Sequence, residues 1–198
     1  MAEITEYRGV EGLVYAEVTK DDDSGYTTGA VKALAGVAEI SKTTSSSSEA
    51  HYYDNIPAVV IQSSGSDEIT CSVSAIPMEV LADITGQQYD SALGVMIEGQ
   101  AVQKYFALGY KTKKTNGDEV YVWRYKGTFG IPDLTSATED DGTTANGQSL
   151  VFTGIATTFK FTKGGNVKAL NVDVAEDKVV VTNFFDTVTT PDNLVAKP

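Results

Sequence analysis

Apolar and polar residues alternate on both sides of the dipeptide Asn116-Gly117, within residues 103–131. Alternation is typical of β-strands, and an Asn-Gly dipeptide favours a two-residue hairpin turn because both positions can adopt positive φ. A two-residue turn places Tyr110 opposite Trp123 and Leu108 opposite Tyr125. One hairpin face is then aromatic and directed to the core, while the other is solvated and carries the basic side chains Lys111, Lys113, Arg124 and Lys126.

Short apolar or alternating runs between turn residues indicate further strands. A turn is expected at residues 63–66, and another at Gly164-Gly165 that pairs the strands on either side of it. The expected strands cover residues 13–18, 58–62, 67–76, 91–99, 150–161, 167–174 and 177–182.

One segment has the features of a helix, residues 77–84. Pro77 stands at its first turn, apolar side chains repeat on one face, and Gly86 ends it. Residues 31–42 fit a short helix or a strand, with a strand favoured after Gly36. The pattern predicts an all-β or β-dominated α+β fold, a β-sandwich or partly closed barrel with one flanking helix, long loops and extended termini.

Polar stretches separate these elements. Residues 20–26 are acidic, but they lack the ligand alternation and closing Glu of a calcium-binding loop, so a solvated loop is expected. Residues 132–148 form a second long polar loop, and residues 1–12 and 187–198 are expected to be extended arms. No linker divides the chain, so residues 1–198 are expected to be a single domain.

The serine-rich run at residues 43–48 continues into EAHYYDNIP and lacks strong periodicity. Loops of this length inside a compact domain are usually functional or disordered. Two interpretations stay open, an arm that orders against a partner subunit and a mobile surface loop. If it is an arm, the candidate subunit-interface residues are Ser45, Ser47, His51, Tyr52, Tyr53 and Ile56.

The chain carries 27 acidic and 15 basic residues, a net charge of −12, which disfavours binding to phosphate backbones. Its single cysteine, Cys71, lies in an alternating run and is expected to be a buried strand thiol. One cysteine excludes an internal disulfide framework, which fits folding in a reducing cytosol. No apolar run reaches the ~20 residues of a membrane helix, and the N-terminus lacks a signal-peptide layout.

No catalytic, metal or cofactor site is expected. His51 is the only histidine, and a Cys71–His51 nucleophilic pair lacks a helix N-terminus that would lower the thiol pKa. The adjacent Asp140 and Asp141 lie in a polar loop, where solvation sets their pKa values. The basic hairpin face is not expected to bind single strands, because the aromatic side chains point to the opposite face.

Four stretches together resemble the major tail proteins of long, non-contractile-tailed bacteriophages. They are GLVYAEVTKDDDSGYTTG (12–29), IPMEVLADITG (76–86), EVYVWRYKGTFGIPD (119–133) and TANGQSLVFTGIATTF (144–159).

The resemblance implies a structural virion protein without catalytic residues. Such subunits form sixfold rings that stack into a tube, assemble in the host cytoplasm, and conduct DNA without binding it specifically. Tape-measure and tail-terminator proteins are the implied partners besides the chain itself. The implied bridging segments are the serine-rich stretch to Ile56, residues 133–148 and both termini.

The acidic charge fits this role, because phosphate contacts along a conduit would slow the passage of DNA. Side chains facing the lumen are therefore expected to be acidic or small and polar. The alternative is a monomeric β-sandwich binding module, such as an adhesion or capsid-decoration domain.

Overall fold

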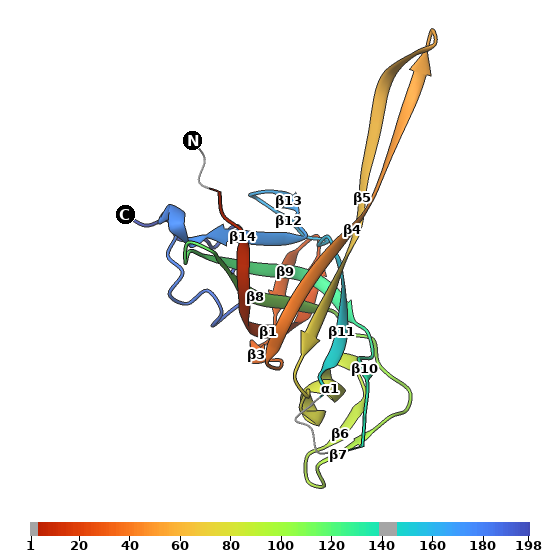
Figure 1. Ribbon diagram of the computed structural model, residues 1–198, viewed down its shortest axis with the longest axis vertical. Coiled ribbons are helices and arrows are strands. Elements are labelled where there is room, and N and C mark those ends of the chain that lie inside the picture. Colours follow the sequence, from red (N-terminus) through yellow and green to blue (C-terminus); the bar gives the residue numbers. More distant parts are fainter. Residues whose placement is uncertain (1–3, 139–145) are drawn as a thin grey trace.

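The computed structural model describes residues 4–138 and 146–198, and its strands dominate the fold (Figure 1). Ten strands form one antiparallel sheet, in which the main path runs β2-β1-β8-β9-β11-β5-β4. Strands β10, β14 and β3 pair with β11, β9 and β1 respectively. The ten are β1 (Tyr7–Asp22), β2 (Gly25–Thr28), β3 (Lys32–Ala33), β4 (Val37–Tyr53), β5 (Ile56–Val73), β8 (Phe106–Lys114), β9 (Glu119–Phe129), β10 (Asp133–Leu134), β11 (Gln148–Ile155) and β14 (Ala169–Asp173).

Two small hairpins and two helical segments complete the described residues. The hairpins are β6 (Gln88–Asp90) with β7 (Val95–Ile97), and β12 (Lys160–Phe161) with β13 (Gly165–Asn166). The helices are α1 (Met78–Thr85) and the 3₁₀ turn η1 (Val174–Glu176). The predicted strand-dominated class with a flanking helix is confirmed, and α1 follows Pro77 and ends at Gly86 in the left-handed conformation, as its sequence predicts.

The central hairpin forms as β8–β9, but its register differs by one residue from the prediction. Lys114 donates its amide to Asp118, so residues 115–117 make a three-residue loop with only Gly117 at positive φ, 94°. This is the second common hairpin geometry, a turn followed by a left-handed glycine. Tyr110 therefore lies opposite Val122 and not opposite Trp123.

A one-residue slip moves side chains to the other face of the sheet. Leu108 and Tyr110 share a face with Val122 and Arg124, while Trp123 and Tyr125 point the opposite way. All six are buried. The expected solvated basic face is wrong, because the centre of the hairpin is covered on both sides.

The first core lies between the sheet and α1. Tyr15, Phe106, Phe129 and Phe152 form a chain of edge-to-face and tilted ring contacts with centroids 5.0–6.4 Å apart. Cys71 lies in this core with no exposed surface, and burial raises the pKa of its thiol to about 12. The predicted buried strand thiol is confirmed.

The second core lies on the other face, where the C-terminal segment packs against Trp123 and Tyr125. The indole N–H of Trp123 donates to the carbonyl of Phe184, and the hydroxyl of Tyr125 donates to that of Thr189. The expected free tail from residue 187 is therefore wrong over this part, since the segment is needed to cover two large aromatic side chains. The predicted strand at 177–182 is also wrong, because only an isolated bridge between Val179 and Ala196 occurs there.

Three other local predictions differ from the structure. Residues 63–66 continue β5 and make no turn. Gly164-Gly165 closes the small β12–β13 hairpin, while β14 pairs with β9 and not with β11. The expected N-terminal arm joins the sheet from Tyr7 onward, because β1 pairs with β8 from that residue. The carboxylates Asp140 and Asp141 lie outside the described residues.

Candidate assembly interface

The longest hairpin, β4–β5, extends far beyond the rest of the molecule (Figure 1). From Asp67 towards the hairpin turn, β4 and β5 pair only with each other among the described strands. About nine residues of β4 therefore project from the sheet, roughly 30 Å at the usual strand rise. Asp54 and Asn55 form its turn at φ values of 51° and 63°. Residues 43–57 are thus regular hairpin, and the expectation of an unstructured loop is wrong.

The base of the projecting part is held by buried polar contacts. Asp67, 4% exposed, accepts from the Arg124 guanidinium at 3.1 Å and from the Thr44 hydroxyl at 2.9 Å. Lys168 lies 3.5 Å from the same carboxylate and donates to Ser64. These contacts fix the direction in which the hairpin leaves the sheet.

The serine-rich middle of the hairpin is polar. Ser47 and Ser63 lie opposite each other with their hydroxyl oxygens 2.6 Å apart, and Ser45 lies beside Gly65 at a bulge. Cross-strand hydroxyl pairs of this kind stabilise a sheet modestly. They hold the strands together without creating an apolar face.

The distal part of the hairpin is apolar and exposed. Six of its side chains are between 48% and 66% exposed, namely Tyr52, Tyr53, Ile56, Val59, Val60 and Ile61. The register sets Val59 and Ile61 on one face and Val60 on the other. A hairpin lying flat on its own core would expose one face only, whereas here both faces are uncovered.

The structure brings all six predicted interface residues onto this one hairpin. Ser45 and Ser47 lie in its polar middle, while His51, Tyr52, Tyr53 and Ile56 lie at its distal end. Sequence reasoning missed Val59, Val60 and Ile61 as interface candidates, because a run of β-branched residues is typical of a buried strand. The Asp54-Asn55 turn ahead of that run is the signal that could have placed it at a hairpin tip.

A groove opens where the sheet path ends without closing. Its cavity, of about 520 Å³, is lined by the start of β1, the base of β4 and the β8–β9 face. Tyr110, Val120 and Val122 lie in it beside Val10 and Ile40. Lys42 and Arg124 also line it, and among the described residues Glu39 is the acidic one in its lining.

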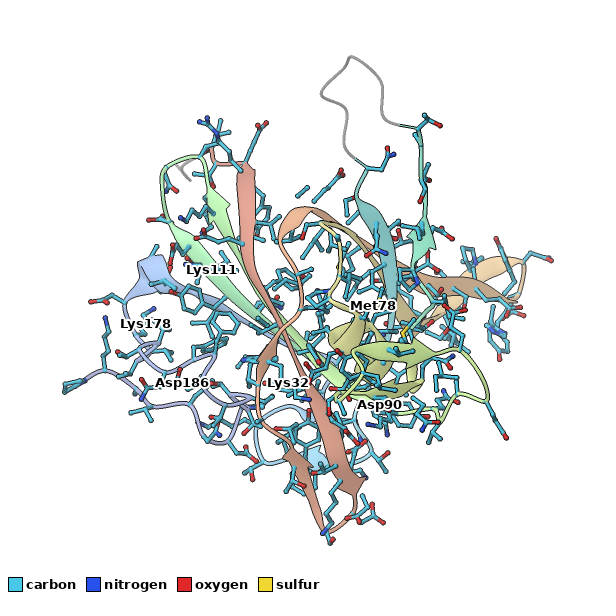
Figure 2. The ribbon with its side chains drawn as sticks, turned by 90° about the horizontal axis from the view of Figure 1, so that it is seen from below. Lys32, Met78, Asp90, Lys111, Lys178 and Asp186 are labelled. Carbon is cyan, nitrogen blue, oxygen red and sulfur yellow. The ribbon has the colours of Figure 1, made fainter. Side chains whose placement is uncertain are left out.

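The opposite end of the molecule carries a second exposed apolar surface. It comprises the β6–β7 hairpin and the segments beside α1, with Met78, Leu93, Val95, Ile97, Ile131 and Leu134 exposed. Figure 1 shows this end below the sheet and the β4–β5 tip above it, and Figure 2 looks at this end, with Met78 and Asp90 labelled. Two cavities lie at this end. One of about 150 Å³ has Glu98 as its charged lining residue, and the other, of about 740 Å³, is lined by the charged side chains Lys32, Glu79, Asp83 and Lys104.

The lysines of the β8–β9 hairpin do not form an open basic patch. Lys111 and Lys113 both lie 2.9 Å from Glu11 and within 3.7 Å of Glu119. Hydrogen bonds from Lys113 and Lys111 lower the pKa of Glu11 to about 2, so this carboxylate stays ionised and balances the lysines. Lys111 shares a face with Tyr121, contrary to the prediction, but that ring packs against Phe184 and Phe185.

Lys126, the other lysine expected on a solvated face, is largely covered and lies against Asp21. Their charged atoms lie 2.5 Å apart, and Asp21 also accepts the amides of Thr158 and Phe159. Burial would raise the pKa of Asp21, but the donors outweigh it and the pKa is lowered. The solvated loop predicted at 20–26 is therefore wrong, because β1 continues to Asp22 and β2 begins at Gly25, with a tight turn between them. Its Asp21 carboxylate is covered and fastens β1 to the β11–β12 connection.

The fold does not bring His51 and Cys71 together. His51 lies opposite Val59 near the hairpin tip, whereas Cys71 pairs with Ile40 at its base. Eleven residues of strand separate Ile40 from His51, roughly 35 Å, which excludes a nucleophilic pair. Within residues 4–138 and 146–198 no group of three His, Cys, Asp or Glu side chains is arranged to hold a metal ion.

No helix among the described residues is long and apolar enough to cross a membrane. A scan against protein-family models finds no matching family, and a search of curated proteins finds no significant match.

Proposed function

We propose that this chain is a structural subunit that assembles with copies of itself into rings and a stacked tube, as the resemblance to phage major tail proteins implies. The observation that carries the proposal is the β4–β5 hairpin, which projects from the sheet and exposes apolar side chains on both faces. Exposed apolar surfaces of this kind mark protein interaction sites. A two-stranded hairpin alone in water is only marginally stable, so a partner that covers it stabilises it.

Self-association of such a hairpin favours a repeating assembly. The β4–β5 tip and the β6–β7 hairpin lie at opposite ends of the molecule (Figure 1), and the groove is lined by the start of β1, the base of β4 and the β8–β9 face. Contacts between unlike surfaces are heterologous, and they generate rings when the rotation closes and filaments when it does not. Stacked rings combine both outcomes.

The charge of the chain supports a conduit for DNA over a DNA-binding protein. Each copy carries a net charge of −12, and a ring multiplies this charge around its axis. Lys111, Lys113 and Lys126 are paired with carboxylates, which leaves little free basic surface on the hairpin expected to be basic. Under this proposal the chain belongs to the virion tail, with tape-measure and tail-terminator proteins as further partners.

The proposal is tested by sedimentation velocity and negative-stain electron microscopy over a concentration series. We expect annular or tubular particles from the wild-type chain at high concentration. Val60→Ser should weaken association at least tenfold, while Val195→Ser should not. The two valines are matched, because they are 58% and 61% exposed and only Val60 lies on the hairpin.

A chain that stays monomeric at all concentrations contradicts the proposal. That result favours the alternative of a monomeric β-sandwich binding module for adhesion or capsid decoration.

A further inference from the structure

We propose that the groove between β1 and β4 is the receptor for the β4–β5 tip of a second copy of the chain. The inference rests on the proposed self-assembly and assigns the two surfaces that meet. The occupant is the distal end of the hairpin, with Tyr52, Tyr53 and Ile56 entering the groove.

The groove is built to receive apolar side chains. Tyr110, Val120 and Val122 reach it from the first core, and Val10 and Ile40 stand on its two sides. Its volume of about 520 Å³ lies within the range of specific binding pockets. Aromatic anchors that fill such pockets contribute most of the binding energy of protein interfaces.

The groove is also flanked by free strand edges. Among the described strands, β4 pairs only with β5, and β1 from Tyr7 to Leu13 pairs only with β8. Free strand edges present unpaired backbone groups that associate with another chain. An incoming hairpin therefore finds backbone partners beside the apolar floor.

The shape of the tip fits insertion into a groove. Val59 and Ile61 lie on one face of the hairpin and Val60 on the other, so a flat contact would leave one apolar face in water. A groove with two walls covers both faces. The two tyrosines at the end present large apolar rings with a polar hydroxyl, which suits an interface that is apolar at its centre and polar at its rim.

Charge does not oppose the same pairing. From Ala50 to Ile61 the only charged side chain is Asp54, at the turn. The groove lining carries Lys42 and Glu39, while Arg124 there is already paired with Asp67. Two copies of a chain with a net charge of −12 repel each other over most of their surface, and a contact between a nearly uncharged tip and a balanced lining adds little to that repulsion.

The apolar surface at the opposite end of the molecule is a poorer receptor. Its apolar cavity is about 150 Å³ and is lined by Glu98, which would face Asp54 with like charge, while the larger cavity of about 740 Å³ is lined by Lys32, Glu79, Asp83 and Lys104 and is therefore polar. The groove combines a volume of about 520 Å³ with an apolar floor, and Lys42 offsets Glu39 in its lining. These differences decide between the two surfaces.

A copy cannot place its tip in its own groove. Ile40 of the groove and Tyr53 of the tip belong to the same strand, β4, and are thirteen residues apart. A continuous strand of that length spans roughly 40 Å, so the tip points away from the groove of its own chain. Each copy can then bind one neighbour through its tip and a different neighbour through its groove, the arrangement that makes rings and filaments.

Disulfide trapping tests the contact. A Tyr53→Cys chain is mixed with an Ala38→Cys chain, since Ala38 is exposed and lines the groove, and the mixture is oxidised under assembling conditions. The native Cys71 is fully buried and does not interfere. We expect a cross-linked dimer from the mixture, and at least tenfold less from either variant alone.

A second variant tests the groove without cysteines. Ala38→Trp fills the groove from an exposed position and should weaken self-association at least tenfold, with an unchanged circular dichroism spectrum. Ala30→Trp, at an exposed position outside the groove lining, is the matched control and should associate like the wild type.

The outcomes separate the two claims. If the wild type assembles but Ala38→Trp assembles equally well, or Tyr53→Cys cross-links to Leu93→Cys and not to Ala38→Cys, the groove is not the receptor and the proposed function stands. If the wild type never self-associates, the proposed function and the inference both fail.

Discussion

Arg124 and Asp67 show how one buried ion pair positions a projecting element. Their side chains are 10% and 6% exposed, and Asp67 lies at the point where β5 leaves its neighbour β11. A buried charge that loses its partner is strongly destabilising, whereas replacing both partners by apolar groups can be nearly neutral. Removing one partner of this pair should therefore lower the free energy of unfolding more than removing both.

Asp67→Ala should lower the free energy of unfolding by about 3–5 kcal/mol, because it leaves the Arg124 guanidinium buried without its carboxylate. The double variant Arg124→Met with Asp67→Leu should stay within about 1 kcal/mol of the wild type, since no deeply buried charge is left unpaired and Lys168, whose side chain is 24% exposed, keeps its hydrogen bond to Ser64. Urea unfolding measures both. Equal losses from the single and double variants would show that the pair itself, and not the stranded charge, carries the effect.

Asp21 gives the fold a dependence on acid. The pKa of Asp21 is lowered in the folded state below its ordinary value of 3.8. A lowered pKa means that the carboxylate stabilises the fold above pH 3.8, and that this contribution is lost as the pH falls through the folded-state pKa. Below pH 4 the unfolding free energy of the wild type should decline.

Asp21→Asn should be less stable than the wild type at pH 6, and the difference should shrink as the pH falls below 4. The measurement is the urea midpoint from pH 6 to pH 2. Asp23→Asn, which removes a carboxylate from the exposed turn two residues away, serves as the control and should follow the wild-type curve. A constant difference between Asp21→Asn and the wild type at every pH would contradict the role of the carboxylate.

At the scale of elements, the turn residues determined how well the hairpins could be predicted from the sequence. The Asn116-Gly117 dipeptide correctly located the β8–β9 hairpin, but a loop of three residues and not two moved the register and exchanged the faces. Local sequence specifies that a turn occurs more strongly than which of two closely related turns forms. Both faces of the hairpin centre are buried, so a contrast between a buried and a solvated face could not select the register from the sequence.

The composition of the β4–β5 hairpin prevented its prediction from the sequence. Its turn is Asp54-Asn55 without glycine, and its serines lack apolar alternation, so neither strand carried the usual signal. The predicted helix, by contrast, had both its start and stop residues in the sequence and is present at α1. Sequence reasoning identified the interface candidates from Ser45 to Tyr53, ahead of the turn, and Ile56 after it. It interpreted Val59, Val60 and Ile61 as part of a buried strand.

Gly127 shows how closely β9 and β11 approach. An added Cβ there would lie 2.5 Å from the carbonyl oxygen of Thr153 and would also meet the ring of Phe152. Gly127→Ala should therefore cost about 1–3 kcal/mol through overpacking. Gly99→Ala, where an added Cβ meets no atom within 4 Å, should change stability by less than about 0.5 kcal/mol in the same chemical denaturation experiment.

At the scale of the whole molecule, the C-terminal segment is part of the body and not an arm. Phe184 and Val188 lie in the second core with Trp123 and Tyr125. No local pattern predicts this packing, because residues 183–190 have neither strand nor helix periodicity. The segment packs there because Trp123 must be covered on this face of the sheet, where it is fully buried. The register predicted from the sequence placed Trp123 on the opposite face, together with Tyr110.

Phe184→Ala should lower the unfolding free energy by about 3–5 kcal/mol and shift the emission of the single tryptophan to longer wavelength, because it leaves a cavity in the buried cluster that contains Trp123. Val195→Ser, at an exposed position of the same segment, should change neither signal. Native-state fluorescence and thermal unfolding provide the two readouts. Unchanged emission from Phe184→Ala would mean that other residues cover the indole.

The central claim is that the projecting hairpin fastens one copy of the chain to the next. Replacing residues 47–63 by Asn-Gly keeps the Ser46–Ser64 pair and every contact at the hairpin base, and it removes the whole apolar tip. Negative-stain electron microscopy of this variant and the wild type, at equal high concentration, is the most direct measurement. We expect rings or tubes from the wild type and isolated particles from the shortened chain. Rings or tubes from both would show that the hairpin does not fasten the copies together.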